Sequence, residues 1–103
     1  MTWLLLKLRV GLRRKVNNPK PFTEKKIEGF IIREFKSDVD MEDLVWHRDR
    51  EDRIVTVLNE NDWKYQEDNK LPVPCQGVIE IKEGVWHRII KGTTNLRVKI
   101  AFV

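Results

Sequence analysis

The strongest constraint on the fold is a series of short β-type runs that recur about every ten residues in the second half of the chain. They are LVWH (44–47), RIVTVL (53–58), WKYQE (63–67), VIEI (78–81), VWHRII (85–90) and LRVKIAFV (96–103). Turn-forming residues separate these runs at 59–62, 68–69, 72–77, 83–84 and 92–95. Such spacing is typical of antiparallel sandwiches and barrels. The final run alternates cleanly, with Leu96, Val98, Ile100 and Phe102 on one face, so we predict an all-β, antiparallel chain.

The N-terminal part of the chain carries its own pattern. Even positions between Leu4 and Leu12 are apolar, whereas Lys7 and Arg9 fall on the odd face, which predicts a half-buried strand. A basic amphipathic membrane helix is the alternative interpretation of the same residues. The turn NNPKP (17–21) follows. We therefore expect an N-terminal strand or arm over residues 1–20 and a barrel over residues 22–103.

Two further elements are expected before the regular series begins. The segment IEGFIIREF (27–35) is a strand candidate, and SDVDMEDL (37–44) favours at most one short helical turn near 38–44. Ser37 or Asp38 is the expected N-cap of that turn, and acidic residues in its first turn suit the helix dipole.

Charge and cysteine content limit the partners of the chain. Net charge is +4 over 103 residues, but residues 1–36 carry +7 and residues 37–103 carry −3. A nucleic-acid-binding face would need a basic stripe on the folded barrel, so nucleic acid is not an expected partner. No apolar run approaches the length of a membrane span, and we expect no membrane association. With one cysteine no intrachain disulfide can form, which favours a reducing, cytoplasmic location.

The tetrapeptide VWHR occurs twice, at 45–48 and 85–88, and holds both histidines of the chain. Different flanking sequences argue against an internal duplication. In extended segments the tryptophans and arginines point away from the histidines, so Trp46 and Trp86 are expected to pack against another sheet or subunit. Alternation also places His47, Asp49, Glu51 and Arg53 on one face. Two imidazoles and one carboxylate that converge in a barrel form the ligand set of a 2-His-1-carboxylate metal centre.

At these residues the sequence resembles small single-domain cupins of the RmlC-like jelly-roll superfamily, over about residues 42–100. The segment QGVIEIKEGVWH (76–87) ends in Gly-x-x-His as the second cupin motif does, with Lys82 in place of the usual proline. The first motif fits in two registers. In one, Asp49 takes the second histidine position and Arg53 the position of the acidic ligand. In the other, Val45 takes the first histidine position and Glu51 is the acid.

The resemblance implies an antiparallel jelly-roll β-barrel with a metal site. Its expected ligands are His47, Glu51 and His87, with Asp49 as the alternative to Glu51, for a divalent ion such as Fe, Mn, Ni or Zn. A further resemblance is to cupin-like proteins encoded by viruses of marine cyanobacteria, which implies no activity.

Metal-dependent chemistry on a small anionic or sugar-like substrate would follow from such a site. The candidate substrate-binding residues are Arg48, Arg50, Arg53 and Arg88. Because small cupins often form dimers, a homodimer is expected, with the Leu4–Leu12 strand as its candidate element. The alternative function is a metal-free binding or assembly module without catalytic activity, in which the His/Asp/Arg cluster is an internal polar network.

Overall fold

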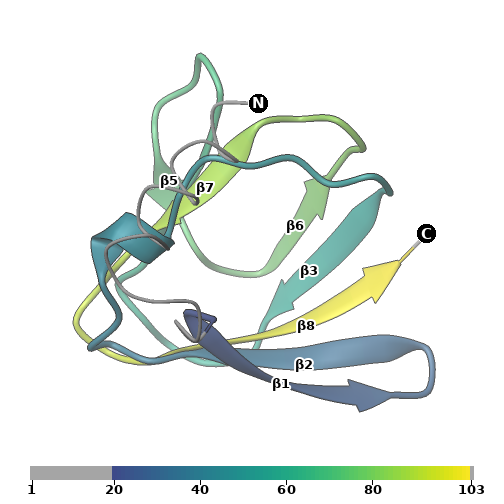
Figure 1. Ribbon diagram of the computed structural model, residues 1–103, viewed down its shortest axis with the longest axis horizontal. Coiled ribbons are helices and arrows are strands. Elements are labelled where there is room, and N and C mark those ends of the chain that lie inside the picture. The colour runs from purple at the N-terminus through teal and green to yellow at the C-terminus, as the bar shows by residue number, and fades with distance from the viewer. Residues whose placement is uncertain (1–19, 103) are drawn as a thin grey trace.

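The computed structural model describes residues 20–102. The predicted strand between Leu4 and Leu12 lies outside these residues and stays a prediction. Within the described range the chain forms eight strands and one 3₁₀ turn (Figure 1). The elements are β1 (Phe22–Ile27), β2 (Phe30–Phe35), η1 (Met41–Asp43), β3 (Arg53–Val57), β4 (Lys64–Glu67), β5 (Val73–Pro74), β6 (Val78–Ile81), β7 (His87–Ile90) and β8 (Leu96–Phe102).

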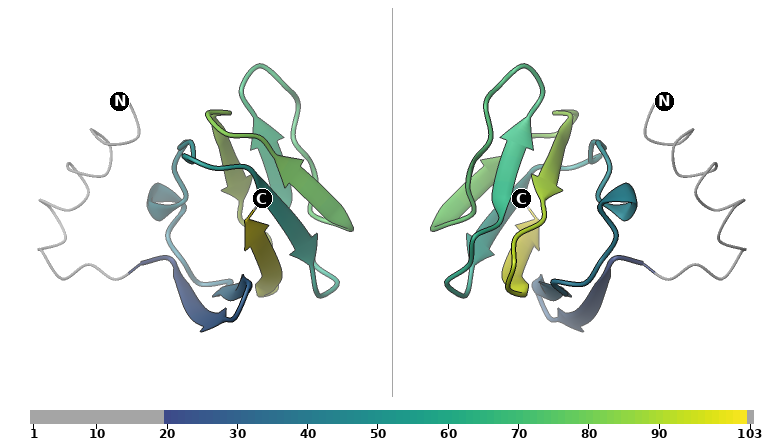
Figure 2. Two further views of the ribbon diagram at one scale, coloured as in Figure 1. Left: turned by 90° about the vertical axis from the view of Figure 1, so that its right-hand side faces the viewer. Right: turned by 90° about the vertical axis from the view of Figure 1, so that its left-hand side faces the viewer.

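The strands form two antiparallel sheets. The larger has the order β1-β2-β8-β3-β6, and the smaller has the order β5-β4-β7. Strand β8 lies in the middle of the larger sheet, where Ile100 is opposite both Ile31 of β2 and Val55 of β3. Figures 1 and 2 show the larger sheet curling so that β6 comes round toward β7 of the smaller sheet. The predicted all-β, antiparallel barrel is confirmed, and its single helical turn lies within residues 38–44 as expected.

The core lies between the inner faces of the two sheets. Alternation along β8 buries Leu96, Val98 and Ile100, while Phe102 at the strand end is 45% exposed. Trp63 is 1% exposed, and its indole N–H donates to the carbonyl of Thr94, so the largest apolar side chain is also fixed by a hydrogen bond. The remaining buried apolar residues are Leu44, Tyr65, Cys75 and Ile81.

The structure differs from the sequence-based expectation in four segments. Residues 27–35 form a turn and a strand rather than one strand, because Glu28 and Gly29 make a two-residue hairpin turn in which Gly29 has φ 92°. Residues 44–47 contribute one β-bridge, at His47. The predicted turn 72–77 contains the short strand β5. Asp40, rather than Ser37 or Asp38, precedes the 3₁₀ turn, and it makes no side-chain capping hydrogen bond.

No helix among residues 20–102 has the length and apolar character needed to cross a bilayer.

Candidate metal centre

A single antiparallel β-bridge joins the two VWHR segments. The N–H of His47 donates to the carbonyl of His87 at 3.0 Å, and the N–H of His87 donates to the carbonyl of His47 at 2.9 Å. Residues paired in this way point to the same side of a sheet. The two imidazole rings therefore lie together on the inner face, with their centroids 4.3 Å apart.

The backbone fixes the orientation of both imidazoles. Nδ1 of His47 donates to the carbonyl of Val45 at 3.1 Å, and Nδ1 of His87 donates to the carbonyl of Val85 at 2.8 Å. Because a carbonyl only accepts, the proton of each neutral ring resides on Nδ1 and the lone pair on Nε2. Metal-binding histidines are usually held by a hydrogen bond of this kind.

Asp49 completes the cluster. Its side chain is 7% exposed, and its two oxygens face the two rings: Oδ1 lies 4.0 Å from Nε2 of His47 and Oδ2 lies 3.5 Å from Nε2 of His87. The ligand atoms of His47, Asp49 and His87 all lie within 4.8 Å of one another. Oδ2 is buried and makes no hydrogen bond. An acceptor oxygen thus faces an acceptor nitrogen at short range, an arrangement that a bridging cation would stabilise.

A metal ion is a better candidate for that cation than a proton on His87. Burial lowers the pKa of His87 below its usual value, and the neighbouring His47 and Arg53 lower it further. The hydrogen bond to Val85 and the charge of Asp49 act in the opposite direction but do not restore it. His87 is therefore neutral near pH 7, with the lone pair on Nε2 available to a metal.

The two acids that the sequence left open occupy different places. Asp49 lies in the cluster, whereas Glu51 accepts a hydrogen bond from Nε of Arg53 at 2.9 Å and forms an ion pair with its Nη2 at 2.8 Å. The chain bends at Arg50 and Glu51, so the strand-like alternation that would place both acids on one face stops after Asp49. Nε of Arg53 also lies 3.5 Å from Oδ2 of Asp49. Arg53 therefore connects the cluster with Glu51.

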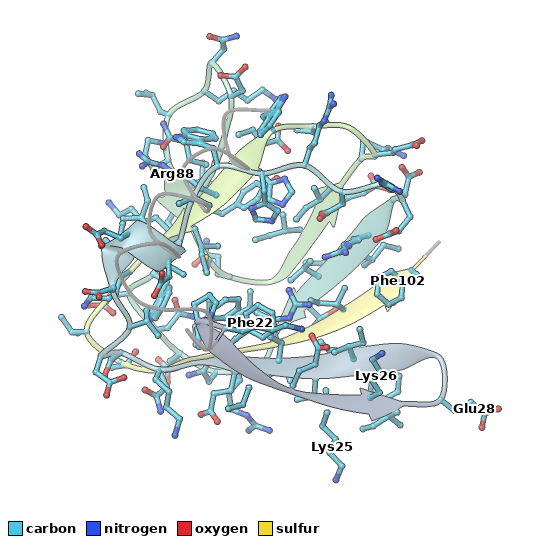
Figure 3. All side chains as sticks on the ribbon, viewed as in Figure 1. Phe22, Lys25, Lys26, Glu28, Arg88 and Phe102 are labelled. Atoms are coloured by element: carbon cyan, nitrogen blue, oxygen red, sulfur yellow. The ribbon has the colours of Figure 1, made fainter. Side chains whose placement is uncertain are left out.

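The four candidate substrate-binding arginines also lie in different parts of the structure. Of the four, Arg53 lines the central cavity. Arg48 and Arg88 lie over the tryptophan rings of the opposite VWHR copy, at 5.3 Å from Trp86 and 4.8 Å from Trp46. Figure 3 shows Arg88 on the side of β7 that faces away from the barrel interior. Arg50 is exposed and does not line the cavity.

Sequence reasoning missed Tyr65, which lies beside the cluster. Its ring centroid is 5.8 Å from that of His87, and its hydroxyl donates to Oε2 of Glu67 at 2.9 Å. Burial, followed by the hydrogen bond to Glu67, raises the pKa of Tyr65 above its usual value, so the phenol is protonated. The pairing of Glu67 with His87 places these residues at the site, and no sequence pattern reveals that register.

The cluster opens onto a cavity of about 390 Å³ inside the barrel. Strands β3, β6, β7 and β8 supply mainly aliphatic walls. Cys75 also lines the cavity, and burial raises the pKa of its thiol to about 11, so it is protonated and a poor nucleophile. The aliphatic lining residues are Leu44, Val45, Val55, Val57, Ile79, Ile81, Ile89, Leu96, Val98 and Ile100. The cavity thus has mainly apolar walls, with the His/Asp/Arg cluster among them and three further charged lining residues, Lys20, Arg33 and Asp43.

No family-level sequence profile and no curated protein matches the chain. Several solved structures match it in fold. A protein from Neisseria meningitidis aligns with a TM-score of 0.53 and 12% identity over 95% of each chain. A cupin-2 domain protein from Shewanella frigidimarina aligns with a TM-score of 0.53 and 12% identity, over 90% of this chain and 88% of that one.

The Fe(II) form of HppE is also similar in structure. It aligns with a TM-score of 0.56 and 14% identity over 80% of this chain, which spans 48% of the HppE chain. At these identities the likeness establishes the fold, in agreement with the resemblance to cupins that the sequence indicated. The chain is therefore a small cupin-like barrel, and His47, Asp49 and His87 come together inside it.

Proposed function

We propose that this cupin-like protein binds one divalent transition-metal ion through His47, Asp49 and His87 and acts on a small molecule held in the barrel cavity. The observation that carries the proposal is the convergence of the two Nε2 atoms on the buried carboxylate of Asp49, whose Oδ2 makes no hydrogen bond. Two imidazoles and one carboxylate suit iron, manganese, nickel and zinc. Such an ion would supply Lewis-acid or redox chemistry, and three protein ligands leave coordination positions open for a substrate.

The protein's own residues support this role in three ways. Val45 and Val85 hold the imidazoles in the ligating orientation. The aliphatic walls exclude water from the bound molecule and give it an apolar surface to contact. Arg53 places a guanidinium beside the cluster, where it can bind an anionic group.

The proposal also includes a first candidate for the metal and a cellular location. One structural neighbour, HppE, was solved in its Fe(II) form, so Fe(II) is the first ion to test. A single free cysteine, which is buried, supports a cytoplasmic location. A homodimer formed through residues 4–12 stays a prediction.

Elemental analysis and thermal unfolding test the metal centre directly. Protein without a histidine tag is expected to contain stoichiometric metal, or to gain thermal stability with Fe²⁺, Mn²⁺, Ni²⁺ or Zn²⁺. His87→Gln should lose that gain, whereas the matched replacement Asp52→Asn, at an acid that binds the backbone of Glu83, should keep it. Wild-type protein with neither bound metal nor a thermal shift would contradict the proposal and favour a metal-free binding module.

A further inference from the structure

The charge around the candidate metal centre changes sign when a divalent ion binds. Among the described residues, Asp49 and Glu51 supply two negative charges and Arg53 one positive charge. Three further charged residues line the cavity. Lys20 and Asp43 carry opposite charges, and Arg33 forms an ion pair, at 2.6 Å, with Glu24, which lies outside the lining. Apart from the imidazoles, the metal-free site therefore carries one excess negative charge. A divalent ion converts this into one excess positive charge.

An excess charge at this place is poorly screened. The side chain of Asp49 is 7% exposed and that of Arg53 is 20% exposed. Most of the remaining lining side chains are apolar, and charges interact more strongly beside them than in water. The metal-free site consequently repels an anion, and the metal-loaded site attracts one. One negative charge on a ligand is enough to neutralise the excess positive charge of the metal-loaded site.

The volume and lining of the cavity indicate what the uncharged part of the ligand should be. A volume of about 390 Å³ suits a small molecule, and the aliphatic lining offers few partners for hydroxyl groups. A polyol would leave several hydroxyls without hydrogen bonds, which is costly in an apolar environment. A compact apolar body with one anionic group matches both the walls and the charge.

We propose that the ligand of this cavity is a small monocarboxylate with an apolar body, and that it binds cooperatively with the metal. An ion held by Asp49 offsets the negative charge that Arg53 faces at 3.5 Å, and so leaves the guanidinium available to the carboxylate. The proposal rests on the metal centre proposed above and distinguishes between the anionic and sugar-like substrates considered from the sequence. Arg53 is the positioning residue for the carboxylate. Glu51 holds its guanidinium at 2.9 and 2.8 Å, and the Phe102 ring lies 5.3 Å away.

Cooperative binding has a quantitative consequence. The factor by which the carboxylate tightens metal binding must equal the factor by which the metal tightens carboxylate binding. We expect this factor to be about tenfold, within the usual range for coupling between two ligands. Benzoate is a suitable probe because it is a small, apolar monoanion. Benzamide has nearly the same shape without the charge.

The test is calorimetric titration of untagged, metal-free protein with Ni²⁺, alone and at saturating benzoate or benzamide, and the reciprocal titration with benzoate. Wild-type protein should bind Ni²⁺ about tenfold more tightly with benzoate and should show no such change with benzamide. Arg53→Gln should bind Ni²⁺ alone more tightly than the wild type, because a positive charge 3.5 Å from Asp49 is removed, and should lose the benzoate effect. These two opposite changes would not both follow from a merely structural role.

Two further variants keep the result interpretable. Glu51→Gln should strengthen the benzoate effect, since it leaves the charge of Arg53 uncompensated. This variant tests the role of Arg53 if Arg53→Gln does not fold. Arg48→Gln, on the outer face over Trp86, should behave as the wild type. Equal effects of benzoate and benzamide, or a benzoate effect retained by Arg53→Gln, would overturn this inference alone. Failure of wild-type protein to bind Ni²⁺ both with and without benzoate would overturn the metal centre as well.

Discussion

Replacing Asp49 by asparagine should affect stability and metal binding in opposite directions. Oδ2 of Asp49 is buried, makes no hydrogen bond and faces the lone pair of His87 Nε2 at 3.5 Å. An asparagine amide has nearly the same volume and can turn its NH₂ group toward that nitrogen. The variant loses the ion pair between Arg53 and Asp49, but Arg53 keeps its hydrogen bond and ion pair with Glu51, so the guanidinium stays paired.

The expected magnitudes follow from these contacts. A buried acceptor without a hydrogen bond costs about 1–3 kcal/mol. We expect the new hydrogen bond to His87 to outweigh the loss of the 3.5 Å contact with Arg53, and to stabilise the metal-free variant by about 1 kcal/mol. In a domain of this size that raises Tm by about 4–8 °C. A metal at a hundred times its Kd stabilises the wild type by about 2.7 kcal/mol. Asp49→Asn should lose most of this gain, because one of three ligands has lost its charge.

Thermal unfolding of both proteins, with chelator and with saturating Ni²⁺, measures the two effects separately. Glu51→Gln is the matched control, since it removes the charge of the neighbouring acid but leaves the three ligands in place, and it should still show a metal-dependent shift. The reasoning is refuted if metal-free Asp49→Asn is clearly less stable than the wild type. It is equally refuted if the variant retains the full metal-dependent shift.

Two further predictions concern the scaffold. Trp63→Ala should cost about 3–5 kcal/mol in chemical denaturation, because the side chain is 1% exposed, and Trp63→Phe should cost less. Hydrogen bonds from the hydroxyl and N–H of Thr93 lower the pKa of Asp62 below 3.8. The stability they confer should be complete above this unfolded-state value and disappear as pH falls through the lower folded pKa. Asp62→Asn should remove this acid-dependent loss, and an unchanged pH profile between pH 5 and pH 2 would contradict it.

Most of the fold could be predicted from local sequence patterns. The alternation in β8 and the β-branched run in β3 each specify a strand with one buried face, because side chains alternate along a strand. The hairpin at Gly29 was missed because nine mostly apolar residues look continuous until the positive φ of one glycine is known. Strand β5 exists through its pairing with β4, which is a tertiary contact and leaves no local pattern.

The candidate site was also predictable in part, because side chains alternate along a strand. The inward direction of both histidines could be predicted from residue type and from the alternation of side chains along a strand. The choice between Asp49 and Glu51 depends on the bend at residues 50–51. The expected alternation of side chains assumes an unbroken strand and places both acids on one face. The position of Tyr65 beside His87 depends on the register of β4 against β7. Register between strands distant in sequence is set by packing of the whole barrel.

The two VWHR segments occupy equivalent places on either side of one β-bridge. They cross antiparallel at their histidines, so each residue before a histidine lies opposite the residue after the other one. Trp46 therefore meets Arg88, and Arg48 meets Trp86. This arrangement is two-fold symmetric at the level of four residues, although the flanking sequences differ. The bridge places both histidines inside and a tryptophan–arginine pair outside on either side, so the candidate metal centre and the outer face opposite it are built around one contact.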